Sequence, residues 1–328
     1  MKLSLMPIFS FLIPMVLAGG IAPYAHANPA HWQQQWPQTD FSKTNINYHE
    51  ILEGGPGKDG IPAIDDPQFR SVKDYGKLTE TEPVISLVIN GEARAYPLQV
   101  LMWHEIVNDT IGGMPVAVTY CPLCNASMVF DRRVGGQVLD FGTTGKLRHS
   151  DMVMYDRQTE SWWQQFIGQG IAGEMTGVTL KAVPSRLVSF SEFKKNHPDG
   201  KVLVPNNERL RAYGKNPYVN YIHSSSPFLY RGQYTLPLPP LAHVVTVGTH
   251  AWPLETLRQR GEIRFDTLII RWQSGQNSAL DTASTGKGVD VGNITVQRNE
   301  NGRLVDVPYY LTFAFAFNAF MPNGTLHP

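Results

Sequence analysis

The stretch PVISLVINGEARAYPLQVL, residues 83–101, gives the clearest local evidence for the fold. Residues 83–89 form an apolar run, and Asn90-Gly91 is typical of the two-residue turn of a β-hairpin. Pro97 suits the first turn of a helix, since its fixed φ is helical and its missing N–H needs no partner there. The stretch therefore predicts two paired strands followed by a short helix.

The next strand leads to the two cysteines of the chain. The stretch VAVTYCPLCNASMVF, residues 116–130, predicts one strand that ends at Cys121 and another that begins soon after Cys124. Further strands are predicted at 138–141, 151–155 and 162–167 and within 242–272 and 291–317, with a short helix at 191–195. The predicted fold class is therefore α+β and β-rich, with few short helices.

The length and composition limit how many domains the chain can form and which partners its charge can attract. Its 328 residues, 42% of them apolar, suffice for one large domain or two ordinary ones with a hydrophobic core. Lys+Arg and Asp+Glu are equal at 28 each, so no net charge attracts the chain to nucleic acid. The 29 glycines and 24 prolines favour many turns and short strands.

A weak internal repeat predicts two related β-rich halves that pack together. GEARAYPL at 91–98, followed by a strand and YCPLCNAS at 120–127, is matched by GTHAWPL at 248–254, a strand and WQSGQNSA at 272–279. The second copy has glutamine where the first has Cys121 and Cys124. A turn that only the fold required would not need thiols in one copy alone, which suggests that the thiols serve the function.

These patterns divide the chain into five segments. Residues 1–27 are expected to be a signal peptide, because Lys2 precedes an apolar run and Ala25-His26-Ala27 fits a signal-peptidase site. The remaining segments are an irregular N-terminal segment at 28–82, a first half at 83–200, a Pro/Tyr-rich connection at 201–241 and a second half at 242–328, a degenerate repeat of the first. The protein is therefore expected in the periplasm or outside the cell, with no transmembrane segment after cleavage.

Cys121-Pro122-Leu123-Cys124 admits three interpretations. The pair can chelate a soft metal, act as a redox dithiol, or form a structural disulfide. A bridge across so short a loop would add little stability, because the loop-closure entropy that it removes is small. A redox pair of the thioredoxin kind would precede a helix, whereas residues 125–133 are β-prone, which favours a metal site between strands.

His104 is the best candidate for a third metal ligand, followed by Met152, Met154 and His149. If residues 149–154 form a strand, the two methionines share one face and His149 lies on the other. Thioethers beside thiolates suit Cu(I), and imidazole suits copper or zinc. Packing in the core is the competing explanation for the methionines, and a core or surface histidine that of His104.

The carboxylates and the catalytic motifs give little further guidance. The motifs G-x-S-x-G and H-E-x-x-H are absent from the sequence. Glu105, Asp109, Asp131 and Asp151 could act as acids or bases, but no spacing pairs any two of them.

Four segments resemble a family of exported bacterial proteins that is described as domain of unknown function 3179. They are GGPGKDGIPAIDDPQF (54–69), AYPLQVLMWHEIVND (95–109), VTYCPLCNAS (118–127) and LRHSDMVMYDRQTESWWQQFIG (147–168). The resemblance implies an exported bacterial context and a Cys-Pro-x-Cys signature. It implies no activity or cofactor, so the chemistry depends on the residues themselves.

The preferred hypothesis is an exported soft-metal-binding protein that uses Cys121 and Cys124, with copper before zinc. The first alternative is a periplasmic thiol–disulfide oxidoreductase in which Cys121 attacks and Cys124 resolves. The second is a non-catalytic interaction protein with a structural disulfide and an aromatic surface made by Tyr213, Tyr218, Tyr221 and Trp162. The expected partner is an exported protein or a metal donor or acceptor.

Overall fold

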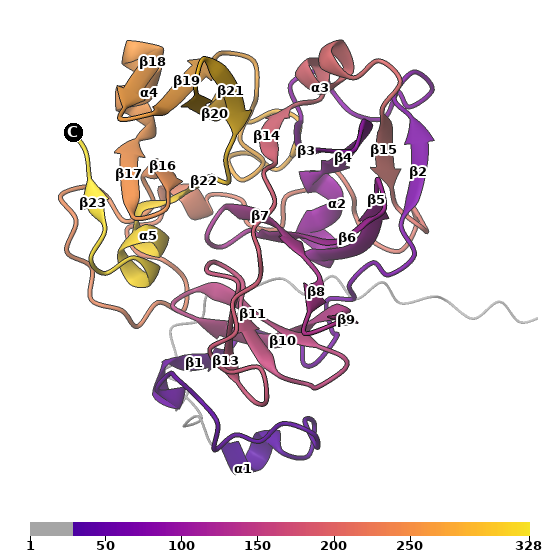
Figure 1. Cartoon of the computed structure of the whole chain (residues 1–328), viewed down its shortest axis with the longest axis vertical. Helices are drawn as coiled ribbons and strands as arrows, with labels where there is room; N and C mark the ends of the chain where they lie inside the picture. The colour runs from indigo at the N-terminus through magenta and orange to yellow at the C-terminus, as the bar shows by residue number, and fades with distance from the viewer. Residues whose placement is uncertain (1–28) are drawn as a thin grey trace, which may run out of the picture.

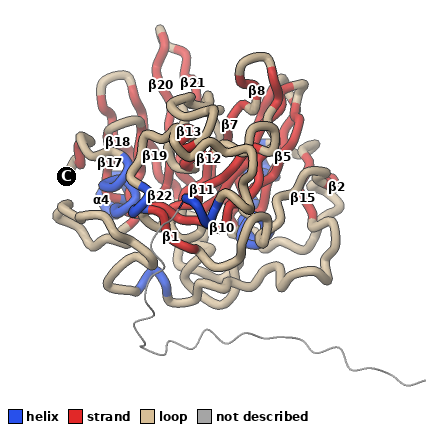
Figure 2. The backbone as a smooth tube through the Cα atoms, turned by 90° about the horizontal axis from the view of Figure 1, so that it is seen from below, coloured by secondary structure: helices blue, strands red, loops and turns tan. Residues whose placement is uncertain are grey.

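Short strands joined by tight turns build most of the molecule, and the helices are one or two turns long. The computed structural model describes residues 29–328. Within that range, five sheets of three to five strands and one two-stranded sheet form a propeller-like ring (Figure 1). Figure 2 shows the same dominance of strands over helices.

Two of the sheets share one strand order. The first runs β14 (Arg186–Ser189), β3 (Pro83–Ile89), β4 (Glu92–Pro97), β15 (Lys201–Val204) and β2 (Gln68–Ser71). The second runs β22 (Tyr310–Phe313), β16 (His243–Val247), β17 (His250–Pro253) and β23 (Thr325–Leu326). In both, the first three strands are antiparallel, and the fourth is parallel to the third.

Each of these sheets carries two helices at matching places. The helix α2 (Leu98–His104) follows β4, and α4 (Leu254–Arg260) follows β17. In the same way α3 (Phe190–Asn196) follows β14, and α5 (Ala314–Phe320) follows β22. A proline immediately precedes both α2 and α4, and the φ and ψ angles of the two prolines are similar. A hairpin, a proline and one short helix therefore recur in the two sheets.

Two further sheets extend from α2 and α4. The first consists of β5 (Ile106–Ile111), β6 (Met114–Cys121) and β7 (Ala126–Asp131). The second consists of β18 (Glu262–Phe265), β19 (Leu268–Gln273), β20 (Asn293–Glu300) and β21 (Arg303–Asp306). Cys121 is thus the last residue of its strand, as Gln273 is of the matching one.

The fifth sheet has no counterpart of the same order within residues 29–328. It runs β1 (Ile51–Glu53), β10 (Phe141–Arg148), β11 (Asp151–Asp156), β12 (Trp162–Gln164) and β13 (Gln169–Ala172), all antiparallel. The remaining elements are the hairpin β8 (Arg133–Val134) and β9 (Gln137–Val138), α1 (Pro29–Trp32), and the 3₁₀ turns η1 (Tyr48–Glu50) and η2 (Tyr221–His223). The turn β10–β11 brings this sheet to the cysteines.

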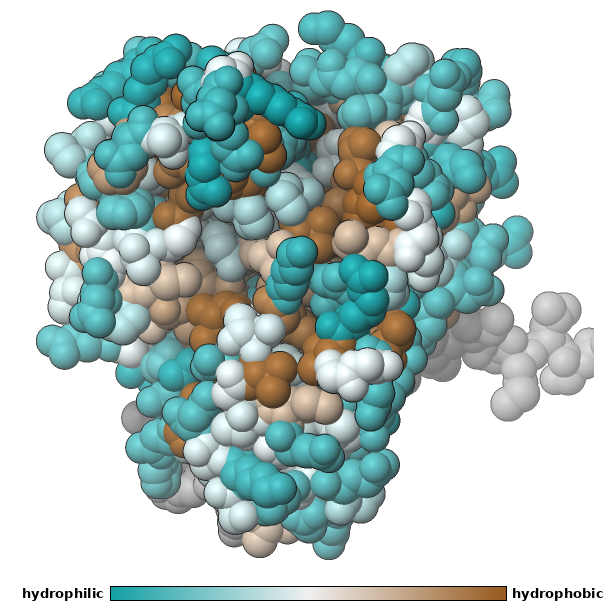
Figure 3. Space-filling model, in the orientation of Figure 1, coloured by the Kyte–Doolittle hydropathy of each residue, from teal (hydrophilic) through white to brown (hydrophobic). Residues whose placement is uncertain are grey.

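One hydrophobic cluster joins the sheets through the centre of the molecule. It includes Tyr96 and Val118 from the first half, Val245 and Phe313 from the second, and both cysteines. Hydrophilic residues dominate the outer rim of the face in Figure 3, and hydrophobic ones gather near the middle. The thiols therefore belong to the central core.

The β-rich fold class with few short helices is confirmed, and three local expectations need correction. Residues 314–317 were expected in a strand, but they begin α5: the alternation of alanine and phenylalanine resembles a strand, yet all four side chains are buried. Trp162 does not contribute to an aromatic surface, because it is fully buried. The irregular segment 28–82 contains the short strands β1 and β2.

The sequence predicted a signal peptide and no transmembrane segment after its cleavage. The predicted signal peptide, residues 1–27, lies outside the described residues. Among residues 29–328, no helix has the length and apolar character that a membrane span requires.

The substitution Phe313→Ala tests the packing between the halves. Phe313 is fully buried and lies on β22, and its N–H donates to the Cys124 carbonyl oxygen over 3.1 Å. Removing the ring should lower the free energy of unfolding by about 3–5 kcal/mol in urea titrations. Leu304→Ala, at a side chain that is 41% exposed, should change it by less than about 0.5 kcal/mol. Equal effects of the two substitutions would contradict this description of the core.

Candidate metal centre

The loop between β6 and β7 places both thiols on one side of a hairpin. Cys121 pairs with Ala126 across the hairpin, and the Asn125 N–H donates to the Pro122 carbonyl oxygen over 3.1 Å. Asn125 has a φ of 51°, a conformation that asparagine tolerates better than most residues. The loop is therefore tight and connects two strands, as the sequence predicted.

A second tight turn faces this loop. His149 and Ser150 join β10 to β11 with φ values of 50° and 67°. Two successive residues with positive φ are typical of a type I′ turn, for which Asn-Gly is the favoured sequence. The turn directs the Ser150 carbonyl oxygen to the thiols, which donate to it over 3.8 Å from Cys121 and 3.4 Å from Cys124. It also places Asp151 at the start of β11.

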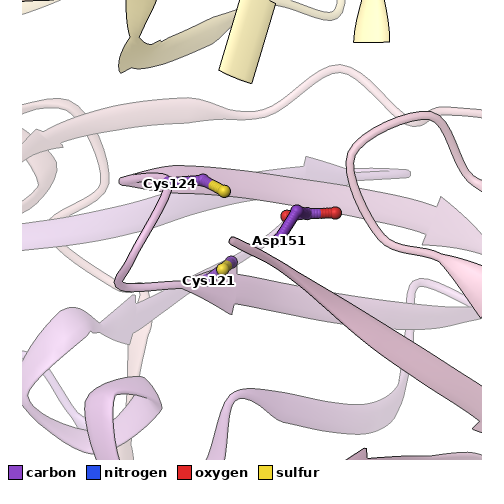
Figure 4. Close-up of side chains that lie close together, drawn as sticks. All are labelled: Cys121, Cys124 and Asp151. Carbon is purple, nitrogen blue, oxygen red and sulfur yellow. The ribbon is translucent and has the colours of Figure 1, made fainter. Parts of the chain in front are cut away.

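The two turns bring together three groups that can bind a metal. The ligand atoms of Cys121, Cys124 and Asp151 all lie within 4.8 Å of one another (Figure 4). Both thiols are free, and the exposed fraction of each of the three residues is 1% or less. Among residues 29–328, this is the one set of three or more His, Cys, Asp or Glu side chains that meets this distance.

The Asp151 carboxylate has one oxygen engaged and one free. Its Oδ2 accepts hydrogen bonds from Gln164 Nε2 over 2.5 Å and from the Phe166 N–H over 2.9 Å. Its Oδ1 is buried and has no hydrogen-bond partner within the described residues. A buried carboxylate oxygen without a partner is costly, so Oδ1 is the atom that a bound cation would satisfy.

Burial raises the pKa values of the acids in and beside this set. It raises the pKa of the Asp151 carboxyl to about 6, although hydrogen bonding to Gln164, the Phe166 N–H and the two thiols lowers that pKa. Burial also raises the pKa of both cysteine thiols, and the neighbouring negative charges raise it further. Burial, followed by the charge of Asp151, raises the pKa of Glu105 to about 8. No basic side chain is among the main influences on these four pKa values.

Glu105 holds an unfavourable backbone conformation beside this set. It caps α2 with φ 58° and ψ −33°, values that cost a residue other than glycine about 1–3 kcal/mol. Its N–H donates to the Leu101 carbonyl oxygen over 2.7 Å, and its own carbonyl oxygen accepts from the Tyr120 N–H over 2.8 Å. The residue is partly exposed, unlike Cys121, Cys124 and Asp151.

Glycine occupies the matching position in the second half. Gly261 caps α4 with φ 72° and ψ −35°. Its N–H donates to the Leu257 carbonyl oxygen, and its carbonyl oxygen accepts from the Trp272 N–H over 2.9 Å. A cleft of about 750 Å³ lies there, lined by Gly261, Trp272 and Gln273 among others. The cleft does not include the thiols.

Residues 205–241, which we call the strap, cover the thiol loop together with β22. The Tyr221 hydroxyl donates to the Leu123 carbonyl oxygen over 3.0 Å, and the Ser150 hydroxyl donates to the Phe228 carbonyl oxygen. On the other side, the Cys124 carbonyl oxygen accepts from Thr312 Oγ1 over 2.7 Å and from the Phe313 N–H. These contacts explain why both sulfur atoms are buried.

The histidines that the sequence suggested have other partners. The His104 ring nitrogens lie 2.8 Å from the Pro62 carbonyl oxygen and 2.8 Å from the Tyr213 hydroxyl, so both are engaged. His149 Nε2 lies 3.4 Å from a Glu50 carboxylate oxygen, and its Nδ1 is buried without a partner. Neither histidine belongs to the set around the sulfur atoms. Their role as ligands is therefore not supported by the geometry.

The methionines stay candidate ligands, and a carboxylate joins the set around the thiols. Met152 and Met154 are buried in the same hydrophobic cluster as the cysteines, so a role as ligands stays a prediction. Asp151, which had no specific sequence signal, is the third member of the set. The signal that could have found it is its place directly after a two-residue turn between strands.

The acidic set makes the stability of the metal-free protein depend on pH. A carboxyl whose pKa is raised on folding stabilises the fold below its unfolded pKa, and this stability is lost as pH rises through the folded pKa. For Asp151 the loss falls between pH 4 and about 6 and amounts to about 3 kcal/mol. About 1 kcal/mol of this is already lost at pH 4.5, so Asp151→Asn should gain about 2 kcal/mol relative to the wild type between pH 4.5 and 7.5.

Urea unfolding with chelator and reductant measures this difference. The control Glu255→Gln, on the exposed surface of α4, should follow the wild type at both pH values. If Asp151→Asn also runs parallel to the wild type, folding does not raise the pKa of the Asp151 carboxyl.

Comparison with known proteins gives a family and no relative with an assigned role. The sequence profile of the family "Protein of unknown function (DUF3179)" matches residues 58–324, which include the thiol loop, Asp151 and all strands of the two sheets of matching order except β23. No curated protein and no solved structure shows significant similarity to the chain. The chain belongs to the DUF3179 family.

Proposed function

We propose that the protein binds a divalent metal ion through Cys121, Cys124 and Asp151, with zinc preferred to copper. The observation that carries the proposal is the buried, unpartnered Asp151 Oδ1 within 4.8 Å of two free thiols. Two thiolates and one carboxylate are ligands that Zn²⁺ accepts, and three protein ligands leave one position open.

A bound cation would offset the free-energy cost of burying three acidic groups together. Without it, two thiols and a carboxyl are buried together, and their pKa values rise. With it, all three groups lose their protons to become ligands, and the charge of the ion compensates theirs. Metal affinity should therefore increase with pH, since binding releases protons.

Because one candidate ligand is a carboxylate, the preferred metal changes from copper to zinc. The sequence favoured copper because thioether and imidazole groups were the expected partners of the thiols. A carboxylate oxygen is a hard ligand that suits Zn²⁺ better than Cu(I). Zinc is therefore the first candidate, and copper the second.

Thiol–disulfide exchange receives less support. Exchange requires an accessible thiolate, whereas Cys121 and Cys124 are buried and their thiol pKa values are raised. The free thiols also give no support to a structural disulfide.

Two broader proposals accompany the metal site. We infer export to the periplasm or beyond from the pattern of residues 1–27, so the partner would be an exported donor or acceptor of metal. We also infer that the halves arose by duplication. The common strand order of the β3 and β16 sheets and the matching caps Glu105 and Gly261 support this.

Metal titration of the reduced, chelator-treated protein tests the function. The wild type should bind about one equivalent of Zn²⁺, and the double substitution Cys121→Ser, Cys124→Ser should abolish binding. Asp151→Asn should raise the Kd for Zn²⁺ by about 100-fold, at the upper end of losses caused by groups that only support a ligand. Competition with a chromophoric chelator under anaerobic conditions measures these values.

A matched control separates the loss of a ligand from the loss of any buried carboxyl. Glu82 is buried and accepts hydrogen bonds from Thr285 Oγ1 and the Thr79 N–H, so Glu82→Gln should bind Zn²⁺ like the wild type. Binding by the double cysteine variant equal to that of the wild type would refute the proposal. Tight Cu(I) binding that Asp151→Asn does not weaken would instead restore copper to the first place.

A further inference from the structure

We propose that Glu105 supplies the fourth ligand, as an exchangeable carboxylate between the buried set and solvent. This inference rests on the proposed metal function and extends it to the coordination shell. It assigns a site residue that the sequence pattern did not distinguish and that lies outside the set of three within 4.8 Å.

The backbone is the first argument. Glu105 adopts φ 58° and ψ −33° at a cap where the second half has glycine with nearly the same angles and the same pair of backbone hydrogen bonds. The fold can therefore fill this position with glycine, the residue that it suits best. Strained residues other than glycine concentrate at functional sites, where their side chain is needed.

The side chain is the second argument. Within residues 29–328, the Glu105 carboxylate has no hydrogen-bond or ion-pair partner that would account for keeping a glutamate there. Its charge raises the pKa of Cys121 and of Tyr218, and the charge of Asp151 raises the pKa of Glu105. The residue thus has no structural task that its side chain visibly performs, and it lies within electrostatic range of the set.

The location is the third argument. The Glu105 carbonyl oxygen accepts from the Tyr120 N–H, which fixes the residue next to the strand end that carries Cys121. The three ligands are buried, while Glu105 is partly exposed. A carboxylate so placed can contact solvent when the ion is absent and turn inward when the ion attracts it. An ion would then have two sulfur and two oxygen ligands, a set that favours Zn²⁺ over Cu(I).

Two substitutions at one position separate the side chain from the backbone. Glu105→Gln keeps the strained backbone and removes the charge, whereas Glu105→Gly removes both. Both variants of the full chain should raise the Kd for Zn²⁺ by about 10- to 100-fold. Both should also change the visible absorption of bound Co²⁺, which reports the ligand field. In the metal-free protein, Glu105→Gly should have a higher urea midpoint than Glu105→Gln, because glycine relieves the strained backbone.

The outcomes distinguish this inference from the function on which it rests. If the wild type binds Zn²⁺ and both variants bind it equally, with an unchanged Co²⁺ spectrum, Glu105 is not a ligand and the three-residue site stands. If the wild type binds neither Zn²⁺ nor Co²⁺, the metal function itself fails. Glu82→Gln serves again as the control and should leave the Co²⁺ spectrum unchanged.

Discussion

The packing of two tight turns against each other is the constraint on which the site depends. The thiol loop after β6 and the His149-Ser150 turn after β10 come from different sheets, and the Ser150 carbonyl oxygen accepts from both thiols. This contact holds two sulfur atoms and the Asp151 carboxylate in one buried place. The raised pKa values follow from it, because burial keeps all three acidic groups out of water.

Unfavourable backbone conformations gather around the same place. Glu105, Asn125, His149 and Ser150 all have positive φ, and none is glycine. Each costs free energy that the surrounding packing must offset, and such residues cluster at functional sites in other proteins. The second half has a glycine cap and an open cleft at the place that matches Glu105, so the cap strain at Glu105 has no equivalent there.

Local patterns predicted much of the fold, and contacts between distant segments explain the errors. Asn90-Gly91 and Pro97 predicted the first hairpin and helix, because each residue type restricts its own backbone. The strand predicted at 314–317 was wrong, because a helix that is buried all round lacks the polar face by which a helix is recognised in a sequence.

For the site, Cys-x-x-Cys was visible from spacing alone. Asp151 was not distinguished, because only the pairing of β10 with β11 and the packing of their turn on the loop bring it to the thiols. His104 shows the converse, since it precedes the thiol strand closely in sequence and yet is held by Pro62 and Tyr213.

The hydrogen bonds from β22 to the Cys124 carbonyl oxygen join the thiol loop to a distant part of the sequence. Thr312 lies 188 residues after Cys124, so the loop is covered on that side only when the sheet that contains β22 has formed. A partly folded chain in which β22 has not yet packed would leave that side of the loop open. Access to the sulfur atoms is therefore coupled to the folding of the second half.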